Sequence, residues 1–197
     1  MEGNTKVKIL KDALELFSQN GYSGTSMSDI AAKVGITKAA LYKHFSGKEE
    51  IFDRLLDIGE GYYEDKFGSR SRLPKIPESA EELMELSLKQ IGFTLHDPDI
   101  VKFRKLFTIE QFRDKRMAEL ATKHFITGLE GMYSLIFERM MEKGVLKQAD
   151  PNFLAFEYAA PITVMIHLCD RQPEHEAEAL KRVRRHIECF ILQYAVC

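Results

Sequence analysis

The chain has 197 residues, a formal net charge of −2, 45% hydrophobic residues and 29% charged residues, which is ordinary for a soluble globular protein. Its pI of about 6.3 argues against a general coating of nucleic acid, so any DNA binding must be local. No run approaches about 18 uninterrupted apolar residues, and the start MEGNTKVK lacks an apolar signal core. We therefore expect neither a membrane span nor secretion.

Amphipathic spacing predicts a first helix over about residues 5–20. Gly21 ends this helix, and Tyr22 after it can pack back against the helix. The residues predicted to face inward are Ile9, Ala13, Leu16 and Phe17.

Residues 26–50 are predicted to form two short helices joined by a glycine turn. Their sequence is SMSDIAAKVGITKAALYKHFSGKEE. Ser26 with Asp29 forms a short capping box that opens the first of them. Gly35 suits the left-handed end of a helix, and Thr37 can cap the second helix, expected over about residues 38–45. This is the helix-turn-helix pattern, whose second helix enters the major groove of DNA.

The charges of this stretch agree with DNA contact. Between Asp29 and Glu49 the sequence has no acidic residue, while a locally basic element is what phosphate contact requires. Four lysines lie there: Lys33, Lys38, Lys43 and Lys48. The charges alone leave a solvated pair of surface helices open as the alternative, whereas the caps, turn and spacing together favour the DNA-binding motif.

The run from about residue 6 to residue 56 resembles the DNA-binding domain of the TetR (tetracycline-repressor-like) family of bacterial transcription regulators. The matching segments are ILKDALELFSQNGYSGTSM, IAAKVGIT and LYKHFSGKEEIF, of which the last is the most specific. The resemblance covers roughly a quarter of the chain, and the remainder carries only a general helical pattern.

The rest of the chain reads as a series of helices. Ser46 with Glu49 predicts a cap for a connecting helix over about residues 47–67, and GSRSRLPKIP over 68–77 predicts a linker. Further helices are expected over about 79–95, from 97 through 107, and over 117–143, 150–169 and 174–195, with Pro161 inside the fourth of these.

No strand-like alternation of useful length appears, so we expect an all-α fold of about nine helices. Its predicted parts are a three-helix helix-turn-helix domain over residues 1–48 and a helical bundle over 49–197 for effector binding and dimerisation.

The last helix carries apolar residues at 3-4-3-4 spacing, the seam of a helix that packs along another. The seam residues are Leu180, Val183, Ile187, Phe190 and Tyr194. The resemblance implies that the last two helices pair across a two-fold axis into a four-helix bundle. Packing into the chain's own core is the alternative that spacing leaves open. Two recognition helices on related half-sites would multiply the affinity for DNA.

The second helix of the motif and its edges supply the residues predicted to contact DNA: Ser26, Thr37, Lys38, Ala39, Ala40, Tyr42, Lys43, His44 and Lys48. Lys38 can donate to guanine acceptors, and Ala39 or Ala40 can touch a thymine methyl group. By resemblance Tyr42, His44 and Lys48 grip phosphates, which sets register without specifying sequence. The helix has no Arg, Asn or Gln, so we expect DNA shape to contribute to specificity.

The resemblance also implies a pocket for a small-molecule effector within the helices over about residues 80–169. The predicted lining residues are Phe103, Phe107, Phe112, Phe125, Leu129, Met132, Tyr133, Met165 and His167. Glu110 and Gln111 are polar neighbours that could orient a ligand. The thirteen Phe and eight Met of the chain fit an adaptable apolar cavity and fit an ordinary core equally well.

Signals for catalysis are missing from the sequence. It has no HExxH, no phosphate-binding loop, no GxSxG and no GxGxxG after a strand, so we expect no catalytic residue and no cofactor. His186 and Cys189 have i, i+3 spacing, which can hold a metal, but no further ligand lies nearby in the sequence, so no metal site is predicted. The odd set Cys169, Cys189 and Cys197 indicates reduced thiols in a cytoplasmic protein.

Together these features predict a ligand-responsive, DNA-binding transcriptional repressor that binds a palindromic operator as a homodimer. A small apolar or amphipathic effector is expected to release it. The expected partners are a double-stranded DNA operator, the effector and a second copy of the chain, with no membrane. The alternative is a helical dimer that binds a small molecule or a protein and has no sequence-specific DNA binding.

Overall fold

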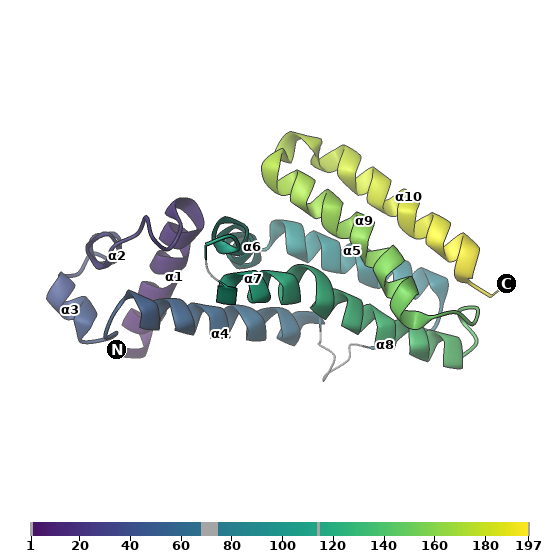
Figure 1. Cartoon of the computed structure of the whole chain (residues 1–197), viewed down its shortest axis with the longest axis horizontal. Helices are drawn as coiled ribbons and strands as arrows, with labels where there is room; N and C mark the ends of the chain where they lie inside the picture. Colours follow the sequence, from purple (N-terminus) through teal and green to yellow (C-terminus); the bar gives the residue numbers. More distant parts are fainter. Residues whose placement is uncertain (1, 68–74, 114, 197) are drawn as a thin grey trace. The chain divides into compact units, whose positions relative to one another are not determined.

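A computed structural model describes residues 2–67, 75–113 and 115–196 of the chain (Figure 1). Over these residues the regular structure is helical, and the single extended contact is a bridge between Leu146 and Ala195. The predicted all-α class is confirmed. Most of the predicted linker, residues 68–74, lies outside the described ranges.

The helices follow the capping and proline signals of the sequence. The N-terminal helices are α1 (Glu2–Asn20), α2 (Met27–Val34), α3 (Lys38–Tyr42) and α4 (Lys48–Phe67). They are followed by α5 (Ala80–His96), α6 (Pro98–Glu110), α7 (Lys115–Thr122), the π-turn η1 (Lys123–Thr127), α8 (Gly128–Glu142), α9 (Pro151–Arg171), the 3-10 turn η2 (Pro173–His175) and α10 (Glu176–Tyr194). If the continuous run from Lys115 to Glu142 is counted as one helix, the described residues form nine helices, the number expected.

The long helix predicted over residues 117–143 is interrupted by the π-turn η1. There the N–H of Gly128 donates to the carbonyl oxygen of Lys123. A Cβ atom at position 128 would lie 2.6 Å from that oxygen, so the turn depends on glycine. Apolar spacing reports the average period of a helix and not a single wider turn, which is why the sequence analysis missed it.

The chain divides into two compact units, each built from two segments. Unit 1 contains residues 1–63 and 98–118, and unit 2 contains residues 64–97 and 119–197. In unit 1, α6 packs against α1, so it belongs with the helix-turn-helix segment. The functional boundary predicted between residues 48 and 49 stays a prediction.

Three aromatic rings form the centre of unit 1. Phe17 of α1, Tyr22 of the following loop and Phe52 of α4 have ring centroids 4.6 to 5.6 Å apart. Tyr22 thus packs back after Gly21, as predicted. α4 approaches α6 closely at Gly59, where an added Cβ would lie 2.8 Å from the ring of Phe103.

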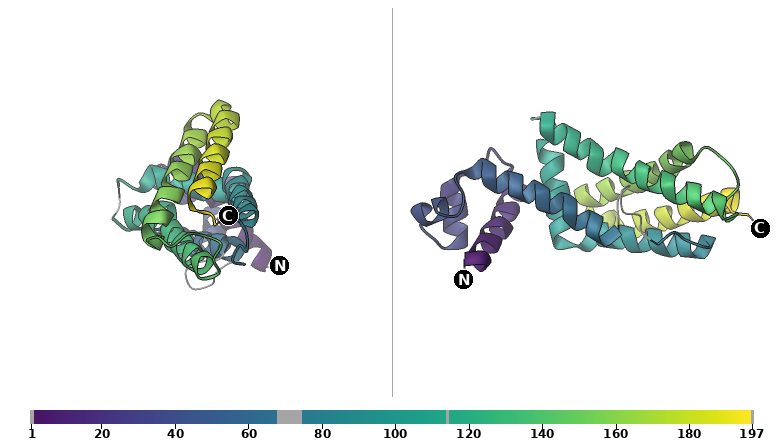
Figure 2. Two further views of the ribbon diagram at one scale, coloured as in Figure 1. Left: turned by 90° about the vertical axis from the view of Figure 1, so that its right-hand side faces the viewer. Right: turned by 90° about the horizontal axis from the view of Figure 1, so that it is seen from below.

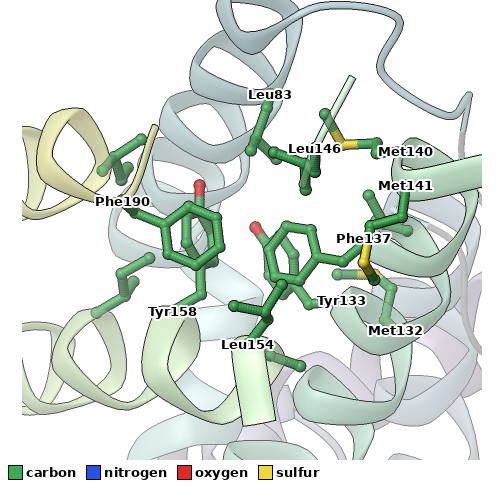
Figure 3. Packing of buried hydrophobic residues seen from close by; sticks show 14 of the residues in the cluster. Leu83, Met132, Tyr133, Phe137, Met140, Met141, Leu146, Leu154, Tyr158 and Phe190 are labelled. Atoms are coloured by element: carbon green, nitrogen blue, oxygen red, sulfur yellow. The ribbon is translucent and has the colours of Figure 1, made fainter. Parts of the chain in front are cut away.

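The core of unit 2 is shown in Figure 3, with side chains from α5, α8, α9 and α10. Phe137 of α8, Tyr158 of α9 and Phe190 of α10 have ring centroids 4.7 to 5.2 Å apart. These rings hold three helices together by aromatic packing.

Buried hydroxyl groups inside this core are paired. The Ser87 Oγ atom lies 2.5 Å from the Tyr158 Oη atom, and the Tyr133 hydroxyl donates to Gln90 Oε1 at 2.6 Å. Burial raises the pKa of Tyr158, so its phenol stays neutral and available as a donor. The network satisfies polar groups that would otherwise be costly inside an apolar core.

The apolar seam of α10 fills the core of unit 2 and not a surface. Val183, Ile187 and Phe190 are each at most 4% exposed. Leu180 and Tyr194 pack at the edge of the same cluster. The partner of the seam is the chain's own α9, which lies beside α10 in Figures 1 and 2. The burial of Val183, Ile187 and Phe190 therefore contradicts their assignment to a dimer interface, whereas the assignment of the half-buried Leu180 and Tyr194 stays a prediction.

Among the described helices, α9 is long and apolar enough to cross a membrane by length and composition. This is weak support for a span, because the core helix of a soluble protein passes the same test. The inner face of α9 lies in the core of unit 2, where Leu154, Tyr158 and Ile162 are at most 4% exposed.

Candidate nucleic-acid interface

In unit 1, α2, the turn after it and α3 form the helix-turn-helix. The Ser26 hydroxyl accepts the N–H of Asp29 at 3.2 Å, and the Asp29 carboxylate accepts the N–H of Ser26 at 2.8 Å. Gly35 has a φ of +80°, and its N–H and that of Ile36 both bond to the carbonyl of Ala31. The predicted capping box and left-handed glycine are confirmed.

The buried side of α3 sets its orientation. Leu41 is fully buried, and Phe45 just after the helix is 4% exposed. Thr37 caps the helix, since its hydroxyl accepts the N–H of Ala40 at 3.1 Å. The helix is shorter than predicted: it ends at Tyr42, and the chain continues as a turn to His44.

The residues predicted to contact DNA divide by exposure. Six are exposed: Ser26, Thr37, Lys38, Ala39, Tyr42 and Lys43. Three are half-buried: Ala40, His44 and Lys48. The exposed side chains come from the N-cap of α2 and from α3 and its end, so a face of polar and small residues is presented by the motif. Their contacts with DNA stay a prediction.

Two of the four lysines in the basic stretch are used within the protein. Lys33 pairs with Glu15 at 2.8 Å, and this bond lowers the pKa of the Glu15 carboxyl. Lys48 Nζ donates to the carbonyl oxygens of Tyr22 and Thr25, each at 2.7 Å. Among the described residues, Lys38 and Lys43 are exposed and form no ion pair. The ion pair of Lys33 lowers the charge available to phosphates, whereas Lys48 keeps its charge and has two of its three donors occupied.

A further cation, Lys6 of α1, was missed by the sequence analysis. Its Nζ atom lies 5.7 Å from the centre of the Phe45 ring, beside the end of the α3 segment. Only the packing of α1 brings these distant positions together, so local spacing held no signal for it. Lys8 in the same helix instead donates to the carbonyl of Val34 at 2.7 Å, at the C-terminus of α2.

The cap of α4 differs from the predicted pairing of Ser46 with Glu49. Glu50 accepts both the N–H and the hydroxyl of Ser46, at 2.6 Å and 2.7 Å. Because α4 begins at Lys48, Ser46 lies one residue before the N-cap, and the residue four positions on reaches it. The bond from the Ser46 N–H has the largest effect in lowering the pKa of the Glu50 carboxyl, and the bond from the Ser46 hydroxyl lowers this pKa further.

A profile of the family described as "Bacterial regulatory proteins, tetR family" matches residues 9–55, the segment that contains this motif. The resemblance to the TetR family that the sequence predicts is thus confirmed over this segment.

Curated relatives support the same TetR-family domain. The biofilm operon icaADBC HTH-type negative transcriptional regulator IcaR of Staphylococcus epidermidis is 43% identical over 60 residues, which are 30% of this chain and 32% of that protein. IcaR of Staphylococcus aureus strain Newman is 49% identical over 49 residues, 25% of this chain and 26% of that protein. The matched stretch thus spans about a third or less of the length of these relatives.

Solved structures share the fold over nearly the whole chain. A Mesorhizobium loti protein assigned to the TetR family has a TM-score of 0.73 and 22% identity, covering 100% of this chain and 99% of that chain. SmeT, the repressor of the Stenotrophomonas maltophilia multidrug efflux pump SmeDEF, has a TM-score of 0.70 and 20% identity, covering 97% and 90%. At these identities the likeness concerns the fold.

The residues predicted to line a TetR-type effector pocket are divided between the two units. Phe103 and Phe107 lie in α6 of unit 1, buried and stacked with centroids 6.4 Å apart. The rings of Phe125 and His167 meet edge to face at 4.8 Å in unit 2, and both are half-buried. Of the others in unit 2, Leu129 and Met165 are half-buried, and Met132 and Tyr133 are buried in the core cluster.

Phe112 and Glu110 are placed differently from the sequence prediction. Phe112 is 90% exposed on the turn after α6, so it lines no pocket in this structure. Glu110 is 3% exposed, and its carboxylate accepts the N–H of Tyr22 at 2.9 Å. A residue near the end of a helix can turn outward or inward, and apolar neighbours in the sequence do not tell which.

Within the described ranges, no group of three or more His, Cys, Asp or Glu side chains is placed to hold a metal ion. Cys169 is buried and Cys189 is exposed, and neither forms a disulfide. Cys197 lies outside the described residues. His186 Nε2 lies 3.0 Å from the carbonyl oxygen of Tyr158, a contact within the core.

We predict that unit 1 loses stability as the pH falls below about 4. The Ser26 hydroxyl and N–H lower the pKa of Asp29, and similar bonds lower that of Glu50. A carboxyl whose pKa is depressed by folding stabilises the fold above its unfolded pKa, and this contribution is lost as the pH drops through the folded value.

The variant Asp29→Asn should be less stable at neutral pH and should lose less stability between about pH 5 and about pH 3. Thermal unfolding followed by circular dichroism across that range measures this. Glu85→Gln, at an exposed position of α5, is the control. An acid dependence of Asp29→Asn equal to that of the wild type would contradict the assignment.

Proposed function

We propose that this protein is a ligand-responsive transcriptional repressor that binds a palindromic DNA operator as a homodimer. The proposal assigns it no catalytic activity and a cytoplasmic location. The matched relative IcaR is a negative transcriptional regulator, and SmeT, which shares the fold, is a repressor of an efflux pump. The match to IcaR covers only the DNA-binding domain, so the role of the whole chain rests on the observations below.

The observation that carries the proposal is the outward face of α3. Leu41 anchors the helix in the core of unit 1, and Lys38, Tyr42 and Lys43 are exposed on it. Lys38, in the first turn, is the residue best placed to read bases, and Lys43 after the last turn suits a phosphate. With so few cations free of internal pairs, one motif offers limited affinity, which favours a dimer and a contribution from DNA shape.

Exposed apolar side chains on the outer faces of α9 and α10 support the homodimer. Phe153, Phe156 and Val164 follow one face of α9 and are 56% to 59% exposed. Leu192 of α10 is 75% exposed, and the two helices are joined by a bond from the Tyr194 hydroxyl to the Glu157 carboxylate. We propose this surface, and not the buried seam of α10, as the contact with the second copy.

The effector is proposed to be a small apolar or amphipathic molecule bound in unit 2. The half-buried pair Phe125 and His167 offers aromatic groups, and Met165, two positions before His167 on α9, adds a polarisable side chain at the edge of the core cluster. His167 can also bond to a polar group of a ligand, and its ring lies 4.0 Å from the Asp170 carboxylate. The structure of a SmeT–triclosan complex supports a small-molecule ligand for a protein of this fold.

The proposed switch is an equilibrium between two shapes of the dimer. In one shape the two α3 helices have the spacing of successive major grooves, and in the other, favoured by the effector, α4 swings and that spacing changes. The effector can shift this equilibrium by no more than its difference in affinity for the two shapes.

We expect tight, salt-dependent binding to duplex DNA that flanks the protein's own coding region, with preference over random duplex. Fluorescence anisotropy at several salt concentrations measures it. Lys38→Ala should weaken discrimination at the bases it contacts by about 1–3 kcal/mol. Lys43→Ala should weaken binding uniformly and reduce the salt slope by about one.

Lys105→Ala, at an exposed position of α6, is the matched control and should bind as the wild type does. If neither the flanking duplex nor duplexes selected from a random pool bind better than random DNA, the alternative of a helical binding protein without sequence-specific DNA binding is favoured.

Phe156→Glu should break the proposed dimer, because it places a carboxylate in an apolar contact. Sedimentation velocity should report a monomer, and affinity for a two-half-site operator should fall by at least about a hundredfold. Phe112→Glu makes the same change at a residue that is 90% exposed in unit 1 and should leave the dimer intact. A dimeric Phe156→Glu variant would rule out this face.

Binding of a hydrophobic effector should raise the melting temperature by a few degrees and lower the anisotropy of the DNA complex. The compounds to test are triclosan and matched cationic, neutral and anionic hydrophobes. His167→Ala and Phe125→Ala should lose both responses, whereas Phe112→Ala, at a residue that is 90% exposed in unit 1, should keep them. No thermal shift with any compound would count against this effector class.

A further inference from the structure

The loop between α1 and α2, residues 21–25, is held by two helices that come from different parts of the chain. Gly21 ends α1 with a φ of +74°, and its N–H bonds to the carbonyl of Phe17 at 2.9 Å. The Thr25 hydroxyl, which is buried, donates back to the carbonyl of Gly21 at 3.0 Å. Ser26, the N-cap of α2, follows directly. The loop therefore sets where α2 starts.

On one side the loop is held by Glu110, at the end of α6. Its Oε1 atom accepts the N–H of Tyr22 at 2.9 Å, and the side chain is 3% exposed. Arg113 lies 3.5 Å from the same oxygen. A Cβ on Gly21 would lie 2.6 Å from this oxygen, so the absence of a side chain at Gly21 lets the carboxylate approach the backbone.

On the other side the loop is held by Lys48, in the first turn of α4. Its Nζ atom donates to the carbonyl oxygens of Tyr22 and Thr25, each at 2.7 Å, and lies 4.1 Å from the centre of the Tyr22 ring. The N–H of Tyr22 is thus bound by Glu110 of α6, and the carbonyl oxygen of Tyr22 is bound by Lys48 of α4. Two of the three N–H donors of Lys48 are used in this way, which leaves one for a phosphate.

We propose that Glu110 is a positioning residue for DNA binding. It acts through Tyr22 and Lys48 to fix the loop that carries the N-cap of α2, and so orients the helix-turn-helix and the remaining donor of Lys48. The inference rests on the proposed function. It extends the DNA-binding unit to a residue outside the segment that the family profile matches, residues 9–55.

The chemistry of the contact favours this role over a purely apolar packing role. A bond from a backbone N–H to a carboxylate is charge-assisted, and the part-buried N–H of Tyr22 has no other acceptor among the bonds described. Lys48 cannot replace Glu110, because a lysine offers only donors. Loss of Glu110 should therefore free the N–H side of the loop while the carbonyl side stays bound.

The test uses the full-length protein and the tightest duplex that the wild type selects from a random pool. Glu110→Ala should speed hydrogen exchange at the Tyr22 amide and over residues 21–27, and should weaken binding to this duplex by about tenfold. Glu110→Gln keeps an acceptor oxygen at the same place, so it should restore both the protection and the affinity to within about threefold of the wild type.

Two controls separate positioning from general damage. Arg113→Ala removes the neighbouring cation and leaves the bond to Tyr22, so both readouts should stay at the wild-type level. Glu85→Ala makes the same loss of charge at an exposed position of α5 and should also change neither. If Glu110→Ala does not fold, Glu110→Leu, which fills the site but offers no acceptor, takes its place: unchanged protection and affinity in that variant would overturn the inference.

Unchanged exchange at Tyr22 in Glu110→Ala, or unchanged affinity for the duplex, overturns the inference and leaves the proposed function standing. If the wild type prefers no duplex, the proposed function fails and the role of Glu110 in DNA binding fails with it. In that case faster exchange in Glu110→Ala would still show that Glu110 holds the loop, which distinguishes the two failures.

Discussion

The left-handed turn at Gly35 is the constraint on which the helix-turn-helix depends. With a φ of +80° the chain reverses after α2, and no heavy atom lies within 4 Å of where a Cβ would be, so the need for glycine is conformational and not steric. The turn delivers Thr37 to the N-cap of α3, and burial of Leu41 then fixes which side of that short helix faces outward. A five-residue helix cannot hold an orientation alone, so these contacts define the candidate surface.

Several lysines near this surface are bonded to other groups of unit 1. Lys33 and Lys48 stabilise contacts within unit 1, and Lys8 bonds to the C-terminus of α2. Of the four lysines in the basic stretch, Lys38 and Lys43 stay exposed and form no ion pair with another described residue. For a chain with a net charge of −2, a weak local field is consistent with a regulator that depends on two half-sites and DNA shape.

The inclusion of α6 in unit 1 bears on the proposed switch between two shapes of the dimer. Glu110 binds the loop before α2, and Phe103 packs closely on Gly59 of α4, so α6 touches two elements of the DNA-binding unit. A shift of α6 would therefore act on the loop as well as on α4. The proposed swing of α4 then involves a body larger than the connecting helix.

The sequence by itself determined most of the helices and several of their caps, because these depend on residues a few positions apart: Ser26 with Asp29, Gly35, Thr37, and the proline that starts α9. It also supplied the resemblance to the TetR family, because the motif over residues 9–55 is local. Only the tertiary structure decided which face of each helix is buried and which distant groups meet. The seam of α10 lies in the chain's own core, Phe112 points outward, and Glu110 reaches Tyr22 across 88 positions of sequence. Periodicity marks an apolar stripe but not the surface that will cover it, and this is the physical reason for the difference.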